Sequence, residues 1–359
     1  MMIGSANGPP DSAEAIAAAL LRLSPAYAPT PLLDLRALAA RLEVGQVLAK
    51  DEGRRMLGSF KSLGGTYAGL RALARVAETD IEGLLARRPK NLPALICASD
   101  GNHGLAVAAA ARFAGAPARV FLHRGVPAIR ARRIEAQGAE IEWVQGTYDD
   151  AVDAAAAAAR AGAGILVADT TDDPADPVVG DVMAGYGVVA HEVRQQVEAA
   201  AGHRRPTHLF VQAGVGGLAA AMAEGLRDWM ASPQAVIVIE PEKAACVEAM
   251  LLQDKPVRIS GDLHTTAEML SCGEASAPAV AILRRHGARV VTVSEADLEE
   301  GPSLIRADSG SVTTPSGAAG LVGLRRVLED GIGARFGVDA DSRVLAIISE
   351  ADPEQISAV

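Results

Sequence analysis

Short apolar runs alternate with longer amphipathic stretches along most of this chain of 359 residues. The short runs have the length of buried strands, and the stretches between them have the spacing of helices. Such an alternation predicts an α/β fold with largely parallel twisted sheets and helices on both faces. Strands are expected at 94–98, 118–122, 141–144, 164–168, 208–212, 235–239, 290–293 and 344–349.

A chain of this length is long enough for two domains. We expect a small α/β domain over 73–168, inserted into a larger domain formed by 1–72 and 169–359. Helices are expected at 105–113, 127–136 and 149–161, and loops at 87–93, 170–177 and 302–315.

Composition argues against several classes of protein. The net charge of −10 disfavours nucleic acid and anionic membranes as partners, since both attract basic surfaces. No apolar run approaches the roughly 18 residues of a membrane helix. Pro9 and Pro10 interrupt the start of the chain, so no signal peptide is expected. Three cysteines without a CxxC pair fit a reducing cytoplasm, and seven histidines without HExxH spacing predict no zinc site.

A lysine lies among small residues and glycines in the segment Ser59–Gly65. A partly desolvated lysine can form a Schiff base with a carbonyl cofactor. A second tight turn, Ser99–Gly104, presents polar groups further along the chain. Downstream, Gly214-Val215-Gly216-Gly217 follows an apolar run and opens an Ala-rich helix, and helix N-termini of this kind bind phosphate. An aldehyde-reactive lysine together with a phosphate-binding loop outlines a pyridoxal phosphate site.

The same glycine loop also fits the GxGxxA fingerprint of dinucleotide-binding proteins, with Glu240 placed for a ribose. Taken alone, the loop leaves a dinucleotide, a mononucleotide-type phosphate and a merely structural turn equally open. The dinucleotide interpretation is the weaker one because it leaves Lys61 and the Asn102 turn unexplained. In that turn, Asp100 either caps the following helix or contacts a ligand. His103 suits a structural role as well as a catalytic one.

Several motifs follow one another in the order typical of a single enzyme family. They are Thr30-Pro31-Leu32, Lys50-Asp51-Glu52-Gly53, Phe60-Lys61-Ser62-Leu63-Gly64-Gly65, Asp100-Gly101-Asn102-His103-Gly104, Asp169-Thr170, Gln212-Ala213-Gly214-Val215-Gly216, Glu240-Pro241-Glu242-Lys243, Cys246, Cys272-Gly273-Glu274 and Ile348-Ser349-Glu350. On these motifs the chain resembles the fold-type II pyridoxal phosphate enzymes, the group of threonine dehydratase and cysteine synthase. Within the group it most resembles the diaminopropionate ammonia-lyases, because an aspartate before Gly-Asn-His is characteristic of that branch.

The chain departs from the branch in two segments. Pro315 stands where the branch has a glutamate, within Thr313-Thr314-Pro315-Ser316-Gly317-Ala318. The segment Ala275-Ser276-Ala277-Pro278 stands where an earlier Pro-Asn-Pro is expected. Both departures bear on the substrate more than on the chemistry.

The resemblance implies a role for each site residue. Lys61 would hold pyridoxal phosphate as a Schiff base, Asn102 would bind the ring oxygen and Ser349 would meet the ring nitrogen. The phosphate would lie against Gly214, Val215, Gly216 and Gly217. Asp100 and Asp169 would be the carboxylates that face the substrate. No metal is implied.

The implied reaction is α,β-elimination of ammonia from 2,3-diaminopropionate, which gives pyruvate and ammonia. The resemblance also implies a homodimer, and it places Cys246 near Cys272. The alternatives are dehydration of serine, threonine or hydroxyaspartate on the same scaffold, a dinucleotide-dependent oxidoreductase, and a non-catalytic metabolite sensor. Asp100 argues against the first alternative, and an intact Lys61 argues against the last.

Overall fold

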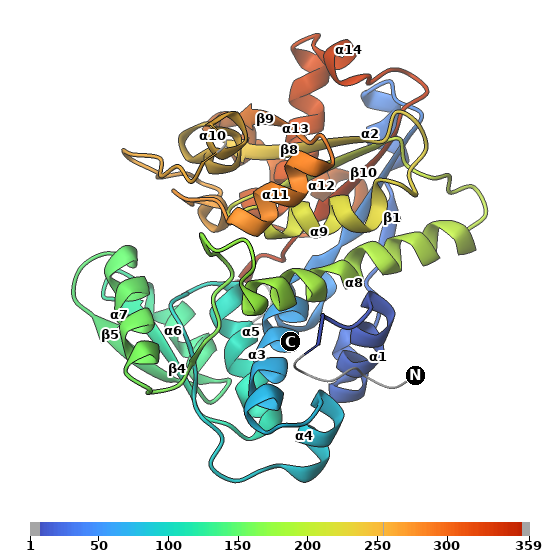
Figure 1. Cartoon of the computed structure of the whole chain (residues 1–359). Helices are drawn as coiled ribbons and strands as arrows, with labels where there is room; N and C mark the ends of the chain where they lie inside the picture. Colours follow the sequence, from blue (N-terminus) through green and yellow to red (C-terminus); the bar gives the residue numbers. More distant parts are fainter. Residues whose placement is uncertain (1–7, 254, 354–359) are drawn as a thin grey trace. The chain divides into compact units, whose positions relative to one another are not determined.

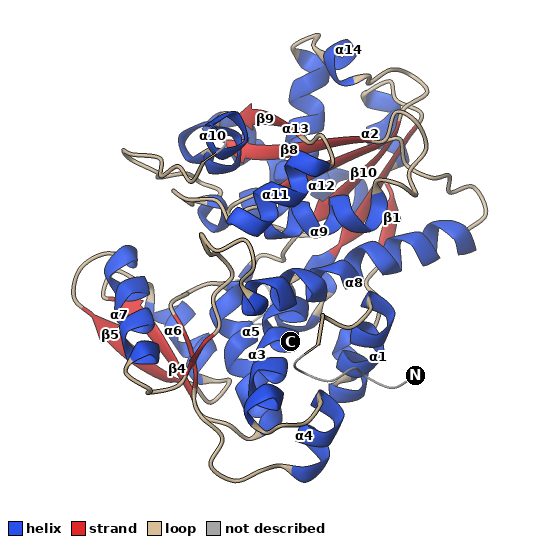
Figure 2. Ribbon diagram, in the orientation of Figure 1, coloured by secondary structure: helices blue, strands red, loops and turns tan. Residues whose placement is uncertain are grey.

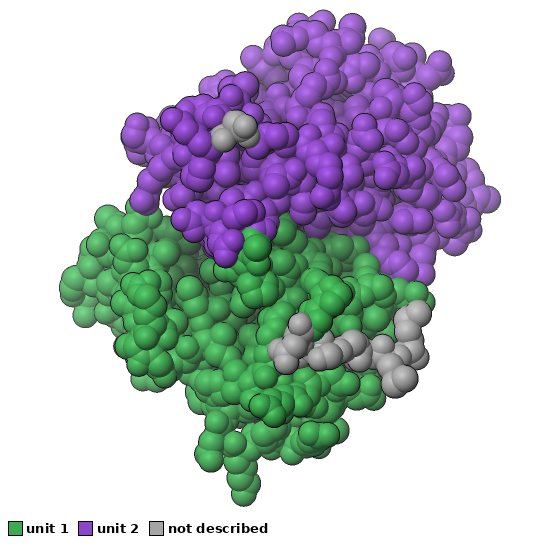
Figure 3. Space-filling model, viewed as in Figure 1, with its two compact units in different colours: residues 1–28, 61–169, 175–188 green, residues 29–60, 170–174, 189–359 purple. Residues whose placement is uncertain are grey.

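A computed structural model of the chain describes residues 8–253 and 255–353. Its packing divides the chain into two compact units, which Figure 3 draws in different colours. Unit 1 consists of 1–28, 61–169 and 175–188, and unit 2 of 29–60, 170–174 and 189–359. Strands and helices alternate in both units, as Figure 2 shows, so the expected α/β fold class is confirmed.

The expected inserted domain, 73–168, lies within the Lys61–Asp169 segment of unit 1. Its expected start falls inside one continuous helix, α3 (Lys61–Val76), all of which belongs to unit 1. The first helix, α1 (Ala13–Leu23), belongs to unit 1 as well. The packing therefore groups more of the N-terminal residues with the smaller unit, and the expected domain boundaries stay a prediction.

Unit 1 contains a four-stranded sheet of parallel strands in the order β5-β4-β3-β6. All four strands coincide with expected ones, and they are β3 (Leu95–Cys97), β4 (Ala118–His123), β5 (Glu140–Val144) and β6 (Ile165–Leu166). The further helices are α4 (Ile81–Arg87), α5 (Asn102–Ala114), α6 (Ala128–Glu135), α7 (Tyr148–Arg160) and the first part of α8 (Pro177–Ala199).

Helices α3 and α5 pack side by side at very short range (Figure 1). A Cβ atom built on Gly65 would lie 2.6 Å from the Cβ of Ala106, and one on Gly69 would lie 2.7 Å from the Cβ of Ala110. Gly64 faces Tyr186 of α8 with equally little room. The glycines after Lys61 therefore let helix backbones approach one another, and this packing fixes the start of α3.

Unit 2 contains a six-stranded sheet in the order β1-β2-β10-β7-β8-β9, in which only β1 runs antiparallel. Its strands are β1 (Leu32–Asp34), β2 (Gln46–Asp51), β7 (His208–Gln212), β8 (Ala235–Pro241), β9 (Arg289–Val293) and β10 (Arg343–Ile348). Its helices besides α8 are α2 (Arg36–Arg41), α9 (Gly217–Leu226), α10 (Cys246–Gln253), α11 (Ala277–Arg285), α12 (Glu295–Ser309), α13 (Pro315–Glu329) and α14 (Gly333–Phe336). Single 3₁₀ turns lie at Pro25–Tyr27, Glu52–Arg54, Met56–Gly58, Glu242–Ala244 and Glu268–Leu270.

The connections in unit 2 place helices on both faces of its sheet. The chain steps from β7 to β8 to β9 in one direction and returns across the sheet to β10. Right-handed crossovers then put α9 and α11 on one face and α12 and α13 on the other, as Figure 1 shows. The carboxyl ends of β7, β8 and β10 share one edge of the sheet, where ligands bind in folds of this type.

Strands β1 and β2 were not expected from the sequence, because charged residues mask the apolar pattern of β2. Lys50 is fully buried there, and its ammonium donates to Thr30 O at 2.7 Å, Glu192 Oε2 at 2.6 Å and Gln196 Oε1 at 2.9 Å. Arg55 binds both Glu52 and Glu192 in the same buried network. The charges are paired and hydrogen-bonded, which is what allows them to be buried.

The expected loop at 302–315 was wrong over most of its length. Helix α12 runs through Pro302 to Ser309, and α13 begins at Pro315, so only 310–314 link the two helices. Gly301 packs closely on α13, and this packing offsets the backbone hydrogen bond that Pro302 cannot make. Pro315 occupies the first turn of α13, where proline is favoured.

Among the described residues, no helix combines the length and the apolar character that crossing a membrane requires.

The packing of α3 on α5 predicts opposite effects for two Gly→Ala substitutions. Gly69→Ala should lower the free energy of unfolding by about 1–3 kcal/mol, because the new methyl group overlaps Ala110. Gly187→Ala in α8 is the matched control, since the nearest atom to its new Cβ is 3.8 Å away. It should raise the free energy by about 0.5–1 kcal/mol through helix propensity. Urea denaturation measures both, and equal effects would contradict the close approach.

Candidate functional site

Lys61 is the first residue of α3, and 22% of its side chain is exposed. Its ammonium donates a hydrogen bond to Oδ2 of Asp169 and forms an ion pair with it. Asp169 closes the long middle segment of unit 1, three residues after β6. The structure thus brings two of the three expected catalytic residues into contact.

The charge of Asp169 is stabilised by its neighbours. Burial opposes ionisation of this carboxyl, but the charge of Lys61 and the hydrogen bond from Lys61 hold the pKa of Asp169 well below its usual range. Tyr186 of α8 lies close enough to Lys61 to feel its charge, and burial raises the pKa of the Tyr186 hydroxyl. Tyr186 therefore stays protonated beside Lys61. No motif pointed to it, because it lies far from Lys61 in the sequence.

His103 has a structural position. It is 4% exposed, its Nε2 lies 2.8 Å from the carbonyl oxygen of Val167, and burial lowers the pKa of its ring. A neutral ring with the proton on Nε2 donates to that carbonyl. His103 thereby ties the start of α5 to the strand end that precedes Asp169.

Asp100 binds Arg130, which sequence analysis did not single out. Arg130 Nη1 lies 2.8 Å from Asp100 Oδ2, and about a quarter of each side chain is exposed. The residue that caps α5 is Gly101, without a side-chain bond, so the interpretation of Asp100 as the helix cap was wrong. Asn102 is the first residue of α5. Lys61, Asp169, Asp100 and Asn102 therefore all lie in unit 1.

The glycine loop of unit 2 joins the end of β7 to the start of α9. Gly216 adopts a left-handed conformation with φ of 96° just before the first helical residue, Gly217. Cys246 Sγ lies 3.3 Å from Gly214 O, and a Cβ on Gly214 would lie 2.9 Å from Cys272 Sγ. The expectation that the two cysteines lie near one another is confirmed, and both are free thiols.

This loop fits a phosphate group. Unpaired N–H groups at the start of α9 and its dipole attract an anion. The backbone N–H of Ser276 donates to Val215 O at 2.9 Å, which places Ser276 beside the loop. Its hydroxyl is buried and has no hydrogen-bond partner within the described residues. A phosphate oxygen would satisfy that hydroxyl, so Ser276 joins Gly214–Gly217 as a candidate phosphate ligand.

Ser349 follows β10 and is held by Gln212 from the end of β7. Gln212 Nε2 lies 2.9 Å from Ser349 Oγ and 3.1 Å from the carbonyl oxygens of Ser316, Gly317 and Ile347. Because three of these neighbours only accept hydrogen bonds, the amide nitrogen of Gln212 must face them. Ser349 Oγ is therefore an acceptor from Gln212.

Glu240 does not occupy a ribose position. It is fully buried, and its two carboxyl oxygens accept hydrogen bonds from the N–H groups of Val247 and Glu248, both at 2.8 Å. Burial raises the pKa of Glu240 to about 8. The carboxyl group therefore serves the start of α10, and the dinucleotide interpretation loses its acidic residue.

A family model described as pyridoxal-phosphate dependent enzyme matches residues 23–350 of the chain. The chain is similar to the diaminopropionate ammonia-lyase of Salmonella typhimurium, with 32% identity over 91% of this chain and 86% of that protein. It is 31% identical to the Escherichia coli K12 protein of the same name, over 91% of this chain and 85% of that protein.

Solved structures of diaminopropionate ammonia lyase are similar to this chain as well. The chain is similar to holo diaminopropionate ammonia lyase from Escherichia coli, with a TM-score of 0.85, 28% identity and coverage of 99% of this chain and 93% of that one. The same enzyme in complex with an aminoacrylate-PLP azomethine reaction intermediate gives a TM-score of 0.83 at 27% identity, with the same coverage of both chains.

The contacts of Gln212 predict the effect of exchanging its amide for a carboxylate. Gln212→Glu would set a negative charge against three carbonyl oxygens. It should lower the free energy of unfolding at neutral pH by about 3 kcal/mol. Burial raises the pKa of the new carboxyl in the folded state, so the loss should shrink as the pH falls toward about 4 and grow as it rises.

Urea denaturation at about pH 5 and about pH 8 measures this dependence. Gln195→Glu, at an exposed position of α8, is the control and should change stability by less than about 0.5 kcal/mol. A Gln212→Glu variant as stable as the wild type at both pH values would show that the amide is not needed as a donor.

Proposed function

Because the chain belongs to the family of pyridoxal-phosphate-dependent enzymes, we propose that it is a lyase acting on 2,3-diaminopropionate. Elimination of the β-nitrogen releases one ammonia, and hydrolysis of the product by one water releases the α-nitrogen as a second ammonia and gives pyruvate. The observation that carries the proposal is the pairing of Lys61 with Asp169 in unit 1. A lysine for the cofactor and a carboxylate for a cationic substrate are the two groups that this reaction needs.

The residues of the chain would hold the cofactor as follows. Bound pyridoxal phosphate supplies an electron sink that acidifies the α-proton of an amino acid. Lys61 would attach it through its amine, and Asn102 would bind the ring oxygen. The phosphate would be bound by the N–H groups of Gly214–Gly217, with Ser276 as a further donor. The orphaned hydroxyl of Ser276 and the left-handed Gly216 support this assignment.

Gln212 would set the direction of the Ser349 proton. Since Ser349 Oγ accepts from Gln212, its own O–H donates to a different acceptor, which in this proposal is the ring nitrogen. A neutral hydroxyl does not force protonation of that nitrogen. The ring is then a weaker electron sink, which suits elimination better than transamination.

Asp169 would face the substrate in its ionised form, which is the form that a base needs. Burial opposes this ionisation, but the ion pair with Lys61 holds the pKa of Asp169 well below its usual range. The cationic substrate would favour the same ionised form. Asp100 would hold the second cationic nitrogen of the substrate or serve the opposite face of the α-carbon, while Arg130 positions it.

Dehydration of hydroxy amino acids is the second candidate. The chain is 27% identical over 81% of its length to a probable D-serine dehydratase of Sinorhizobium medicae, of which it covers 70%. Release of ammonia and pyruvate from D- and L-diaminopropionate, serine, threonine and threo-hydroxyaspartate separates the two functions. Turnover of the hydroxy acids alone would overturn the ammonia-lyase assignment.

A cytoplasmic location and a homodimer complete the proposal. The three free cysteines suit a reducing compartment, and symmetric dimers are the commonest oligomers. Light scattering on the purified protein tests the dimer, and a monomeric mass would refute it.

Lys61→Ala should abolish turnover of diaminopropionate together with the visible absorption band of the bound cofactor. The reason is that the proposal attaches the cofactor to the chain through the amine of Lys61. Reduction of the wild type with borohydride followed by peptide mapping should label Lys61. A label on a different lysine would make the assignment wrong.

Asp100→Asn and Asp169→Asn should affect the two enantiomers of diaminopropionate unequally. The α-protons of the two enantiomers point to opposite faces when the carboxylate is held in one place, so one base does not easily serve both. Each variant should lower kcat about 100-fold or more for one enantiomer, as expected for a lost general base.

Steady-state kinetics with each pure enantiomer checks this expectation. Asp153→Asn, an exposed position of α7 in the same unit, is the control and should leave both rates unchanged. Equal and mild losses on both enantiomers would mean that Asp100 and Asp169 only position the substrate.

A further inference from the structure

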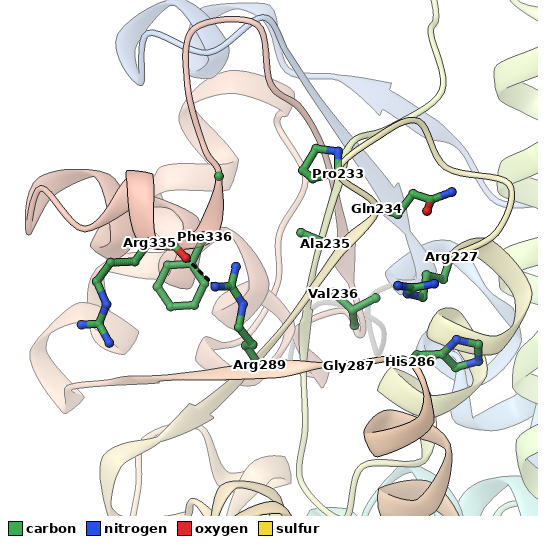
Figure 4. A pocket seen from close by; sticks show the side chains of 11 residues that line it. Arg227, Pro233, Gln234, Ala235, Val236, His286, Gly287, Arg289, Arg335 and Phe336 are labelled. Carbon is green, nitrogen blue, oxygen red and sulfur yellow. Dashed lines mark hydrogen bonds between the residues drawn. The ribbon is translucent and has the colours of Figure 1, made fainter.

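A basic pocket of about 340 Å³ lies at the amino-terminal ends of β8 and β9 in unit 2 (Figure 4). The candidate site residues of this unit follow the carboxyl ends of β7 and β10, at the opposite edge of the sheet. The basic side chains among its lining residues are those of Arg227, Arg289, Arg335 and His286. Its lining contains no Asp or Glu, although the whole chain has a net charge of −10.

Arg289 is held in a fixed orientation. Its guanidinium carbon lies 4.5 Å from the centre of the Phe336 ring, and its Nη1 donates to the carbonyl of Arg335. Figure 4 shows this bond and the Arg289 guanidinium beside the Phe336 ring. A guanidinium that is already ordered loses little side-chain entropy when it binds an oxyanion.

Arg227 reaches the pocket from the end of α9. Its Nε atom is buried and has no hydrogen-bond acceptor within the described residues. It pairs at 3.6 Å with Asp228, whose side chain is 89% exposed, so water screens that pair. A ligand oxygen would give the buried N–H the partner that it lacks.

The helix ends offset only part of the positive charge. Helices α9 and α11 both finish here, and each carboxyl end carries about half a negative charge, which balances about one guanidinium. His286 pairs at 2.7 Å with Glu224, which is not part of the lining. Arg289 and Arg335 have no ion-pair partner in the described part of the chain. The pocket therefore keeps a net positive charge, which favours an anionic ligand.

We propose that this pocket binds the phosphate dianion of a small phosphate monoester. Guanidinium groups bind phosphate through paired hydrogen bonds. The volume reaches the range of about 300 Å³ and above in which small-molecule sites fall, so an organic group has room beside the phosphate. Val236 and Pro233 offer that group an apolar wall. Inorganic phosphate shares the charge but not this contact.

Isothermal titration calorimetry on the cofactor-loaded protein tests the proposal. The buffer contains no phosphate, and unbound cofactor is removed because it is itself a phosphate monoester. The probes are glycerol 3-phosphate and inorganic phosphate, and the first should bind more tightly. Arg289→Gln and Arg227→Gln should each weaken binding about tenfold. Arg36→Gln, whose side chain is 87% exposed on α2 of the same unit, should leave binding unchanged.

Turnover of diaminopropionate by each variant shows that it has folded, because the pocket lies away from the candidate site residues of unit 2. Arg289→Lys keeps the positive charge but loses the paired N–H donors of the guanidinium. This variant should therefore bind more weakly than the wild type and more tightly than Arg289→Gln. No binding by the wild type, undiminished binding by the double variant Arg227→Gln/Arg289→Gln, or equal heats with sodium chloride of the same ionic strength would each overturn the proposal.

Discussion

The close approach of α3 and α5 determines the arrangement of the candidate site in unit 1. Both helices begin at residues that the site uses, Lys61 and Asn102. Because Gly65 and Gly69 lack a Cβ, alanines of α5 lie directly against the backbone of α3. Such contacts between small residues define the separation of two helices with little tolerance. The position of Lys61 therefore follows from helix packing rather than from a loop.

Much of this fold was predictable from local patterns. Every expected strand is present, because buried parallel strands are continuous apolar runs bordered by turns. Strand β2 was not predicted because Lys50 and Asp51 are buried together with an ion-pair partner and a hydrogen-bond donor, respectively, which an apolar pattern does not reveal. The helix around Pro302 was not predicted, because proline disfavours helix interiors and only tertiary packing outweighs that preference.

In the candidate site, too, local sequence reveals some residues, whereas others become apparent only after folding. Lys61, Asp169 and the Gly214–Gly217 loop belong to short motifs that the sequence displays directly. Their partners do not, since Tyr186 and Arg130 are single residues far away in the chain that meet the motifs only after folding. Glu240 illustrates the converse, because a fingerprint placed it at a ribose and the structure places it at the start of a helix. Sequence motifs therefore located the groups, whereas the packing decided what each group can do.

The buried ion network around Lys50 has a consequence for how this chain can evolve. Removing one member, such as Glu192, leaves Lys50 and Arg55 with Glu52 as their single counter-charge, so one buried positive charge is uncompensated at a cost of about 3–5 kcal/mol. That is a large share of the stability of a typical protein. Exchange of the whole set for apolar residues would be tolerated, but each single step towards it passes through an unstable intermediate. The network is thus expected to persist by descent even where it adds little stability, which makes Lys50, Arg55 and Glu192 better markers of ancestry than of activity.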